Sequence, residues 1–205
     1  FWWDPGKPLL RTSLIIDPPS GKLPPLTAEG LKRGAARAAA RSQRGPADSW
    51  EDRSSQERCI LYHGVPPVPT GYNNNYQIAQ TPDHVAIRYE MMAETRIIPL
   101  DGRPHVSKNI RQWMGNSVGR WEGDTLVVET TNYSDKTRFR FPASNETLRV
   151  IERFKRVDAD SIDYQFTVDD PTMYTRQWTA VLPLARAEGP IYEYACHEGN
   201  YGMVG

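Results

Sequence analysis

The stretch Arg111-Gln-Trp-Met-Gly-Asn-Ser-Val-Gly-Arg-Trp-Glu-Gly-Asp-Thr-Leu-Val-Val-Glu-Thr-Thr-Asn-Tyr133 decides the fold class of this chain. A turn at Glu122–Asp124, with glycine at its centre, follows a tryptophan-containing segment and precedes the alternating run Thr125–Thr131. Apolar residues that recur every second position beside a Gly-Asp turn are typical of a β-hairpin and not of a helix. The stretch therefore predicts β-structure, but it does not indicate a chemistry.

The same alternation recurs from Tyr76 onward. Further hairpins are expected over 76–92 and 146–168, and single strands over 96–100, 174–182 and 191–196. Sequential antiparallel strands with one apolar face tend to close on themselves, because closure removes the exposed edges. We therefore expect an all-β fold, an antiparallel up-and-down barrel of about eight strands that holds side chains or one small ligand. The Gly119-Arg-Trp121 element adds a fold-level similarity to lipocalin-like barrels.

The N-terminal part of the chain differs in composition. Residues 1–26 contain six prolines, which predicts an extended arm with one short strand at Leu14–Ile16. Thr27–Arg41 is expected to be a helix, because it is rich in alanine and begins with a threonine that can act as an N-cap. We expect residues 1–58, the arm plus the helix, to pack on the barrel of residues 59–205 within a single structural domain. The helix would cover the outside or plug one end.

Charge and cysteine content limit the partners and the compartment. The 25 basic and 25 acidic side chains balance, which argues against nucleic acid or an anionic membrane as the main partner. No apolar run is long enough to span a bilayer. Cys59 and Cys196 allow one intramolecular disulfide, worth about 4–5 kcal/mol on the chain-entropy model. The alternative is two buried free thiols. A disulfide favours a secreted or periplasmic protein.

A carboxylate occupies an unusual position in the second half of the chain. The strand expected over 148–154 places Glu152 on the same face as Val150 and Phe154. A carboxylate on a core face is costly unless it is paired or has a function. The alternatives are a strand that slips at a bulge and a pair between Glu152 and a buried arginine.

Aromatic and polar side chains could line a cavity inside such a barrel. The ligand-binding candidates are Trp113, Trp121, Tyr133, Trp178, Glu152 and Arg96. For the aromatic residues the alternative is a place in the core. For Arg96 the alternative is a solvent-facing sheet surface shared with Arg88 and Glu90, where the charges pair with each other.

Two segments hold residues suited to acid–base chemistry. One turn places Asp101, Arg103 and His105 close together, and near the other end His197 and Glu198 follow Cys196. A histidine beside a carboxylate is the usual material for proton transfer near neutral pH. The alternative is that these residues only support their loops. The histidine spacings match no zinc motif, and no nucleotide-binding or nucleophile motif is present, so neither a metal nor an organic cofactor is expected. The alternative is a metal site assembled from the distant His105 and His197 with Glu or Asp.

Several motifs carry a resemblance that spans nearly the whole chain. They are Trp2-Trp-Asp-Pro-Gly-Lys-Pro-Leu, Tyr72-Asn-Asn-Asn-Tyr-Gln-Ile, Arg96-Ile-Ile-Pro-Leu-Asp-Gly-Arg-Pro-His, Trp121-Glu-Gly-Asp-Thr-Leu-Val-Val-Glu-Thr-Thr-Asn and Tyr192-Glu-Tyr-Ala-Cys-His-Glu-Gly-Asn-Tyr. In these motifs the chain resembles an uncharacterised family of hypothetical exported proteins from soil bacteria, frequent in acidobacteria and metagenomes. The resemblance implies export and a bacterial source. Members often carry histidines in the second hairpin, where this chain has Tyr89 and Ala93, and this counts against a metal site there.

Three functions follow as hypotheses. The first is an exported bacterial β-barrel protein that binds a small, partly apolar or sugar-like ligand. The second is a hydrolase, lyase or isomerase without a cofactor, in which His105 and His197 exchange protons, Asp101 or Glu198 orients them and Arg103 stabilises an oxyanion. The third is a structural protein that forms homo-oligomers through its N-terminal arm.

Overall fold

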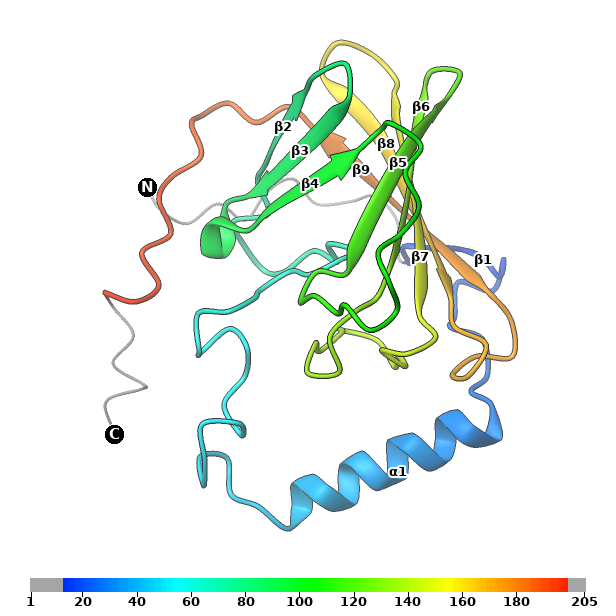
Figure 1. The fold of residues 1–205 in the computed structure, drawn as a ribbon, viewed down its shortest axis with the longest axis vertical. Helices are drawn as coiled ribbons and strands as arrows, with labels where there is room; N and C mark the ends of the chain where they lie inside the picture. Colours follow the sequence, from blue (N-terminus) through cyan, green and yellow to red (C-terminus); the bar gives the residue numbers. More distant parts are fainter. Residues whose placement is uncertain (1–12, 199–205) are drawn as a thin grey trace.

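The computed structural model describes residues 13–198 and shows a mostly β protein (Figure 1). Within these residues there are one α-helix, one short 3-10 helix and nine strands. The helix α1 spans Ala28–Ser42, the 3-10 helix spans Met91–Ala93, and the strands are β1 (Ile15–Asp17), β2 (Tyr76–Gln80), β3 (His84–Tyr89), β4 (Thr95–Pro99), β5 (Asn116–Glu122), β6 (Thr125–Thr131), β7 (Arg149–Arg156), β8 (Ser161–Asp169) and β9 (Trp178–Ala185). The strand expected over 191–196 is not formed.

The strands form two antiparallel sheets. The large sheet has the order β1-β9-β8-β7-β6-β5, and the small sheet has the order β2-β3-β4. Neither sheet closes, so the expected closed barrel is wrong. The sequence places a loop, residues 100–115, between β4 and β5 in place of a tight turn, and no hydrogen-bonded ladder joins these two strands. They meet through side chains instead: a Cβ on Gly119 would lie 2.8 Å from the side chain of Ile98 and 2.9 Å from that of Leu100.

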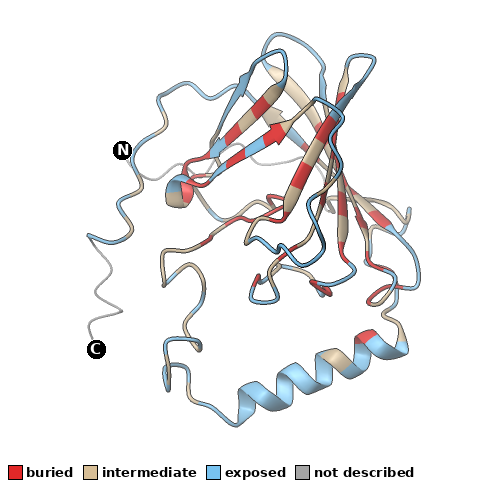
Figure 2. Ribbon diagram, viewed as in Figure 1, coloured by how far each residue is buried: buried red, intermediate tan, exposed pale blue. Residues whose placement is uncertain are grey.

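The hydrophobic core consists of two clusters, one between the two sheets and one against the large sheet. One buried cluster joins both sheets, with Val85, Ile87, Tyr89 and Ile98 from the small sheet and Leu126 and Val128 from β6. A larger cluster includes Val150, Tyr164, Phe166, Tyr174 and Trp178. Buried and more exposed residues alternate along the strands (Figure 2), as the sequence pattern predicts for one-sided sheets. Both clusters take side chains from strands far apart in the sequence.

The helix begins as predicted but does not cover the sheets. The Thr27 hydroxyl caps it by accepting a hydrogen bond from the Gly30 backbone N–H at 3.0 Å. Gly30 is buried against the Met173 backbone, and Arg33 donates to the Ser144 hydroxyl at 3.1 Å. Apart from Gly30 and Arg33, the residues of the helix are exposed (Figure 2), and even Leu31 in the first turn is 61% exposed. The helix therefore lies away from both sheets (Figure 1), because alanine and arginine supply no broad apolar stripe.

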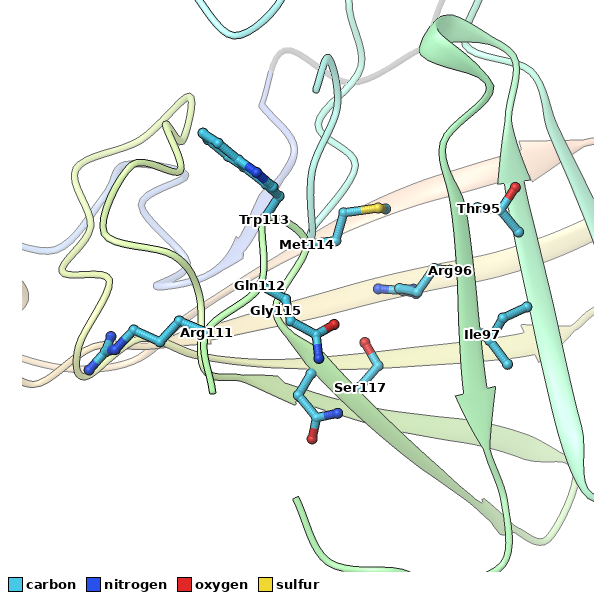
Figure 3. A pocket seen from close by; sticks show the side chains of 10 residues that line it. Thr95, Arg96, Ile97, Arg111, Gln112, Trp113, Met114, Gly115 and Ser117 are labelled. Atoms are coloured by element: carbon cyan, nitrogen blue, oxygen red, sulfur yellow. The ribbon is translucent and has the colours of Figure 1, made fainter. Parts of the chain in front are cut away.

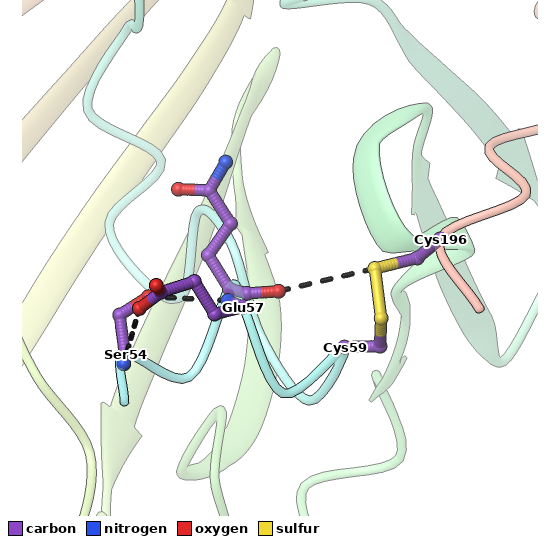
Figure 4. Close-up of a disulfide and its surroundings, with 5 residues drawn as sticks. Ser54, Glu57, Cys59 and Cys196 are labelled. Carbon is purple, nitrogen blue, oxygen red and sulfur yellow. Dashed lines mark hydrogen bonds between the residues drawn. A yellow bond between two sulfur atoms is a disulfide. The ribbon is translucent and has the colours of Figure 1, made fainter. Parts of the chain in front are cut away.

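The two ends of the described chain are tied to the rest of the fold. β1 pairs with β9, and Leu14 and Ile15 pack on the core of their own chain. Cys59 and Cys196 form the predicted disulfide, with an S–S distance of 2.07 Å and the Gln56 carbonyl oxygen 3.8 Å from Cys196 Sγ (Figure 4). The bond is consistent with an oxidising, extracytoplasmic location. In the part of the chain that the structure describes, no helix has the length and apolar character needed to cross a bilayer.

Candidate functional site

A groove opens where β4 and β5 separate. The strands touch at Ile98, Leu100 and Gly119, and a cavity of about 610 Å³ lies beside their N-terminal ends. Its lining comes from two segments: Thr95, Arg96 and Ile97 of β4, and Arg111, Gln112, Trp113, Met114, Gly115, Asn116 and Ser117 at the entry to β5 (Figure 3). The groove therefore lies at the place where a closed barrel would have continued its wall.

Arg96 forms the inner end of the groove. Its guanidinium makes a bidentate pair with Glu152 of β7, with Nη1–Oε2 at 2.7 Å and Nη2–Oε1 at 3.2 Å. Arg96 is 5% exposed and Glu152 is fully buried. The Tyr164 hydroxyl donates to Glu152 Oε1 at 2.9 Å. Burial lowers the pKa of Arg96, but the charge of Glu152 more than compensates, so this pKa lies above its usual value. The pair links the two sheets through the interior.

Some buried donors near this pair have no acceptor among the described residues. They are the Nε of Arg96 and the hydroxyl of Tyr89, which is fully buried. Arg96 pairs with Ile87 in the small sheet, and Tyr89 lies two residues further along the same face. Burial raises the pKa of Tyr89, and the charge of Arg96 opposes this shift. The Tyr89 phenol is therefore a permanent donor at physiological pH.

The walls of the groove combine polar and apolar groups. Figure 3 shows the side chains of Arg96, Gln112, Met114 and Ser117 directed into one space. The Ser117 hydroxyl forms a hydrogen bond of 2.8 Å with the Thr130 hydroxyl. Gln112 is exposed and Met114 is half-buried, so the groove is open on one side. Such a surface can contact an apolar group and hydrogen-bond a polar one.

The other ligand-binding candidates lie at different depths. Trp113 is half-buried and lines the groove, and Glu152 lies behind Arg96. Tyr133 and Trp178 are buried in the larger core cluster, as the alternative for aromatic residues stated. Trp121 is 45% exposed near the end of β5, in a segment that does not line the groove.

The alternation predicted along β7 is confirmed, since Glu152 is on its buried face and pairs with a buried arginine. The solvent-facing position considered for Arg96 and Glu90 is wrong, because both are buried. On β4, Arg96 lies on the inward face of the strand together with Ile98, and Ile87 of β3 is paired directly opposite it.

The structure does not bring the proposed acid–base residues together. His105 contacts Asn116 Oδ1 through Nδ1 at 2.9 Å, and its Nε2 lies 3.3 Å from Glu129 Oε1. Asp101 and Arg103 pair with each other on the surface, and no hydrogen bond or ion pair within residues 13–198 links either of them to His105. His197 and Glu198 are exposed beside the disulfide. No group of three His, Cys, Asp or Glu side chains in the described chain is placed to hold a metal ion.

A second buried polar cluster escaped the sequence analysis. Glu94 is 8% exposed, its carboxylate accepts a hydrogen bond from the Tyr62 backbone N–H, and burial raises its pKa to about 7. His63 stacks on Tyr89 with ring centroids 5.7 Å apart, and burial lowers the pKa of His63 to about 4. No sequence signal marked this cluster: the residues before β4 contain no glycine, and the unfavourable φ of 62° at Met92 is evident only in the structure.

Comparisons of the chain with protein-family models, with curated proteins and with solved structures found no match. The groove is therefore the feature of this protein from which a function can be inferred.

Proposed function

We propose that this protein binds a small, partly apolar or sugar-like ligand in the groove between β4 and residues 111–117. The observation that carries the proposal is the cavity of about 610 Å³ with a buried arginine at its inner end and Met114 and Trp113 in its wall. This volume lies within the range of small-molecule sites, about 300–1,000 Å³. A few fixed polar groups among apolar ones are what orients a small ligand.

We also propose an exported, secreted or periplasmic location and membership of the soil-bacterial family that the sequence motifs resemble. The disulfide supports export, because such bonds are rare in reducing compartments. The enzyme hypothesis has less support, since His105 and His197 make no mutual contact within the described residues. For assembly, the described part of the arm pairs with its own β9, while Trp2 and Trp3 lie outside the described residues.

The test fills the groove by a substitution at its exposed side and leaves the buried Arg96–Glu152 pair unchanged. Gln112 is exposed and lines the groove, so Gln112→Trp fills it from the solvent side. Gln77 is an exposed glutamine on β2, and Gln77→Trp is the matched control. The probe is phenyl β-glucoside, which joins an apolar ring to a sugar, and binding is measured by chemical-shift titration of the protein.

We expect the wild type and Gln77→Trp to bind this probe equally and Gln112→Trp to lose most of the affinity. Equal binding by both variants would place the ligand elsewhere and refute the proposal. A wild-type protein whose spectrum no apolar or glycosidic probe perturbs would refute it as well.

A further inference from the structure

The strand β2 is a free edge of the small sheet. Among the described strands β3 is its one neighbour, and four of its five residues are exposed (Figure 1). A free edge presents unpaired backbone N–H and C=O groups, to which another strand can pair. Other sheet edges of this protein are covered: β1 pairs with β9, and β5 packs against β4 where Gly119 meets Ile98. The edge of β2 has no such cover.

The register of β2 shows which of its backbone groups face outward. Just after the strand, the Thr81 backbone N–H donates to the His84 carbonyl oxygen at 2.9 Å, so Thr81 is bonded toward β3. Bonded and non-bonded positions alternate along an antiparallel strand, so the backbone groups of Tyr76, Ile78 and Gln80 point away from β3. Within residues 13–198 no backbone hydrogen bond reaches these outward groups. They form a row of donors and acceptors along the edge.

This edge lacks the features that keep sheet edges apart. Proteins protect free edges with charged side chains, with proline or with a β-bulge. The sequence of β2 is Tyr-Gln-Ile-Ala-Gln, without charge or proline, and its pairing with β3 runs through all five residues without a shift. Ile78 lies opposite the buried Ile87 on the inward face, yet it is 41% exposed at the edge. Two copies of β2 can therefore approach each other without like charges meeting, and their contact would bury this isoleucine.

We infer that β2 is a dimer interface, where two copies of this chain pair their β2 strands antiparallel about a two-fold axis at Ile78. The axis places Ile78 opposite Ile78 of the second copy and Tyr76 opposite Gln80 of the second copy, so that each outward N–H meets a C=O. The two small sheets become one continuous sheet, with the two isoleucines in contact on its inward face. Because both β2 edges are then used, the pairing stops at two copies. This interface is independent of the groove and of its ligand.

Sedimentation velocity at protein concentrations from about 10 μM to about 1 mM tests the interface, because pairing along one short edge gives a weak dimer. We expect the wild type to change from monomer to dimer over this range. Ile78→Lys places two like charges at the axis and should raise the dimer dissociation constant at least about tenfold. Ile110→Lys is the matched control, since Ile110 is 52% exposed in the loop between β4 and β5, and it should dimerise as the wild type does.

A second variant tests the backbone bonds without adding charge. Ile78→Pro removes the outward N–H, and proline is tolerated on an edge strand where this group faces solvent. Circular dichroism checks that each variant keeps its fold. We expect Ile78→Pro also to raise the dissociation constant at least about tenfold, because it deletes the two hydrogen bonds at the axis.

A wild type that stays monomeric up to the highest concentration would overturn the inference. A folded Ile78→Lys or Ile78→Pro variant that dimerises as tightly as the wild type would overturn it as well, because the two copies would then meet through another surface. The same holds if Ile110→Lys weakens the dimer as much as Ile78→Lys does. Binding of phenyl β-glucoside in the groove is a separate measurement, so the proposed function stands or fails without reference to these results.

Discussion

Replacing Glu94 by glutamine should alter how stability depends on pH. Burial raises the pKa of this carboxyl from 4.5 to about 7, against the hydrogen bonds from the backbone N–H groups of Tyr62, His63 and Gly64. The folded protein therefore keeps a proton that the unfolded chain releases. The stability from this protonation is complete below pH 4.5 and is lost as the pH rises through about 7. At about 1.36 kcal/mol for each tenfold change in proton affinity, the loss is about 3 kcal/mol.

His63 has the opposite effect on the free energy of unfolding. Burial lowers its pKa from 6.5 to about 4, and the charge of Arg140 acts in the same direction. The unfolded chain binds a proton that the folded protein does not bind. The contribution of the neutral His63 to the free energy of unfolding is therefore complete above pH 6.5 and is lost as the pH falls through about 4. At pH values between the ordinary and the shifted pKa values, the contributions of Glu94 and His63 to the free energy of unfolding change in opposite directions with pH. The wild type therefore gains little net pH dependence of stability from these two residues.

Urea titrations from about pH 4 to about pH 8 test this opposition. Relative to the wild type, Glu94→Gln should gain about 3 kcal/mol as the pH rises from below 5 to above 7. His63→Phe keeps an aromatic ring against Tyr89. Its free energy of unfolding should fall by a similar amount, relative to that of the wild type, as the pH rises from about 4 to about 6.5. A Glu94→Gln profile that runs parallel to the wild type over this range would show that the folded carboxyl titrates normally and would refute the reasoning.

Three further changes have expected effects on the free energy of unfolding, each measured by denaturant titration. Arg96→Met or Glu152→Gln alone should cost about 3–5 kcal/mol, because each variant breaks a buried pair, whereas Arg96→Met combined with Glu152→Leu should recover most of the loss in a double-mutant cycle. Cys59→Ser should cost about 5 kcal/mol, because the disulfide closes a sequence separation of 137, and added reductant should lower the wild type to the same stability. Gly119→Val should cost about 1–3 kcal/mol by crowding the side chain of Ile98.

Local features of the fold could be predicted because their causes are local. The Glu122–Asp124 turn fixes the hairpin of β5 and β6, and the Thr27 hydroxyl fixes the start of α1. Strand periodicity places Glu152 on the buried face of β7. Each of these depends on a few neighbouring residues, so a single sequence contains the information.

The relation between the two sheets could not be predicted in this way. Whether β4 pairs with β5 depends on the path of the loop over residues 100–115 and on the approach of Ile98 to Gly119, which periodicity does not describe. The same limit applies to Arg96. Its partner Glu152 is 56 residues away, and a charge on an inward position looks like an exposed one until that partner is known. The groove depends on the separation of β4 from β5 and on the inward position of Arg96.

The buried pair and the open edge have a common explanation. Replacing a buried ion pair by apolar residues of similar size is often neutral or stabilising, so stability alone does not account for Arg96 and Glu152. The pair lies at the inner end of the groove, where β4 and β5 separate, and holds one guanidinium nitrogen without a protein acceptor within the described residues. A binding groove that ends on a charged side chain needs that side chain held rigidly, and the bidentate bonds from Glu152 hold the Arg96 guanidinium in place. The double variant Arg96→Met with Glu152→Leu should therefore fold stably and bind phenyl β-glucoside more weakly than the wild type, which separates the contribution of the pair to binding from its contribution to folding.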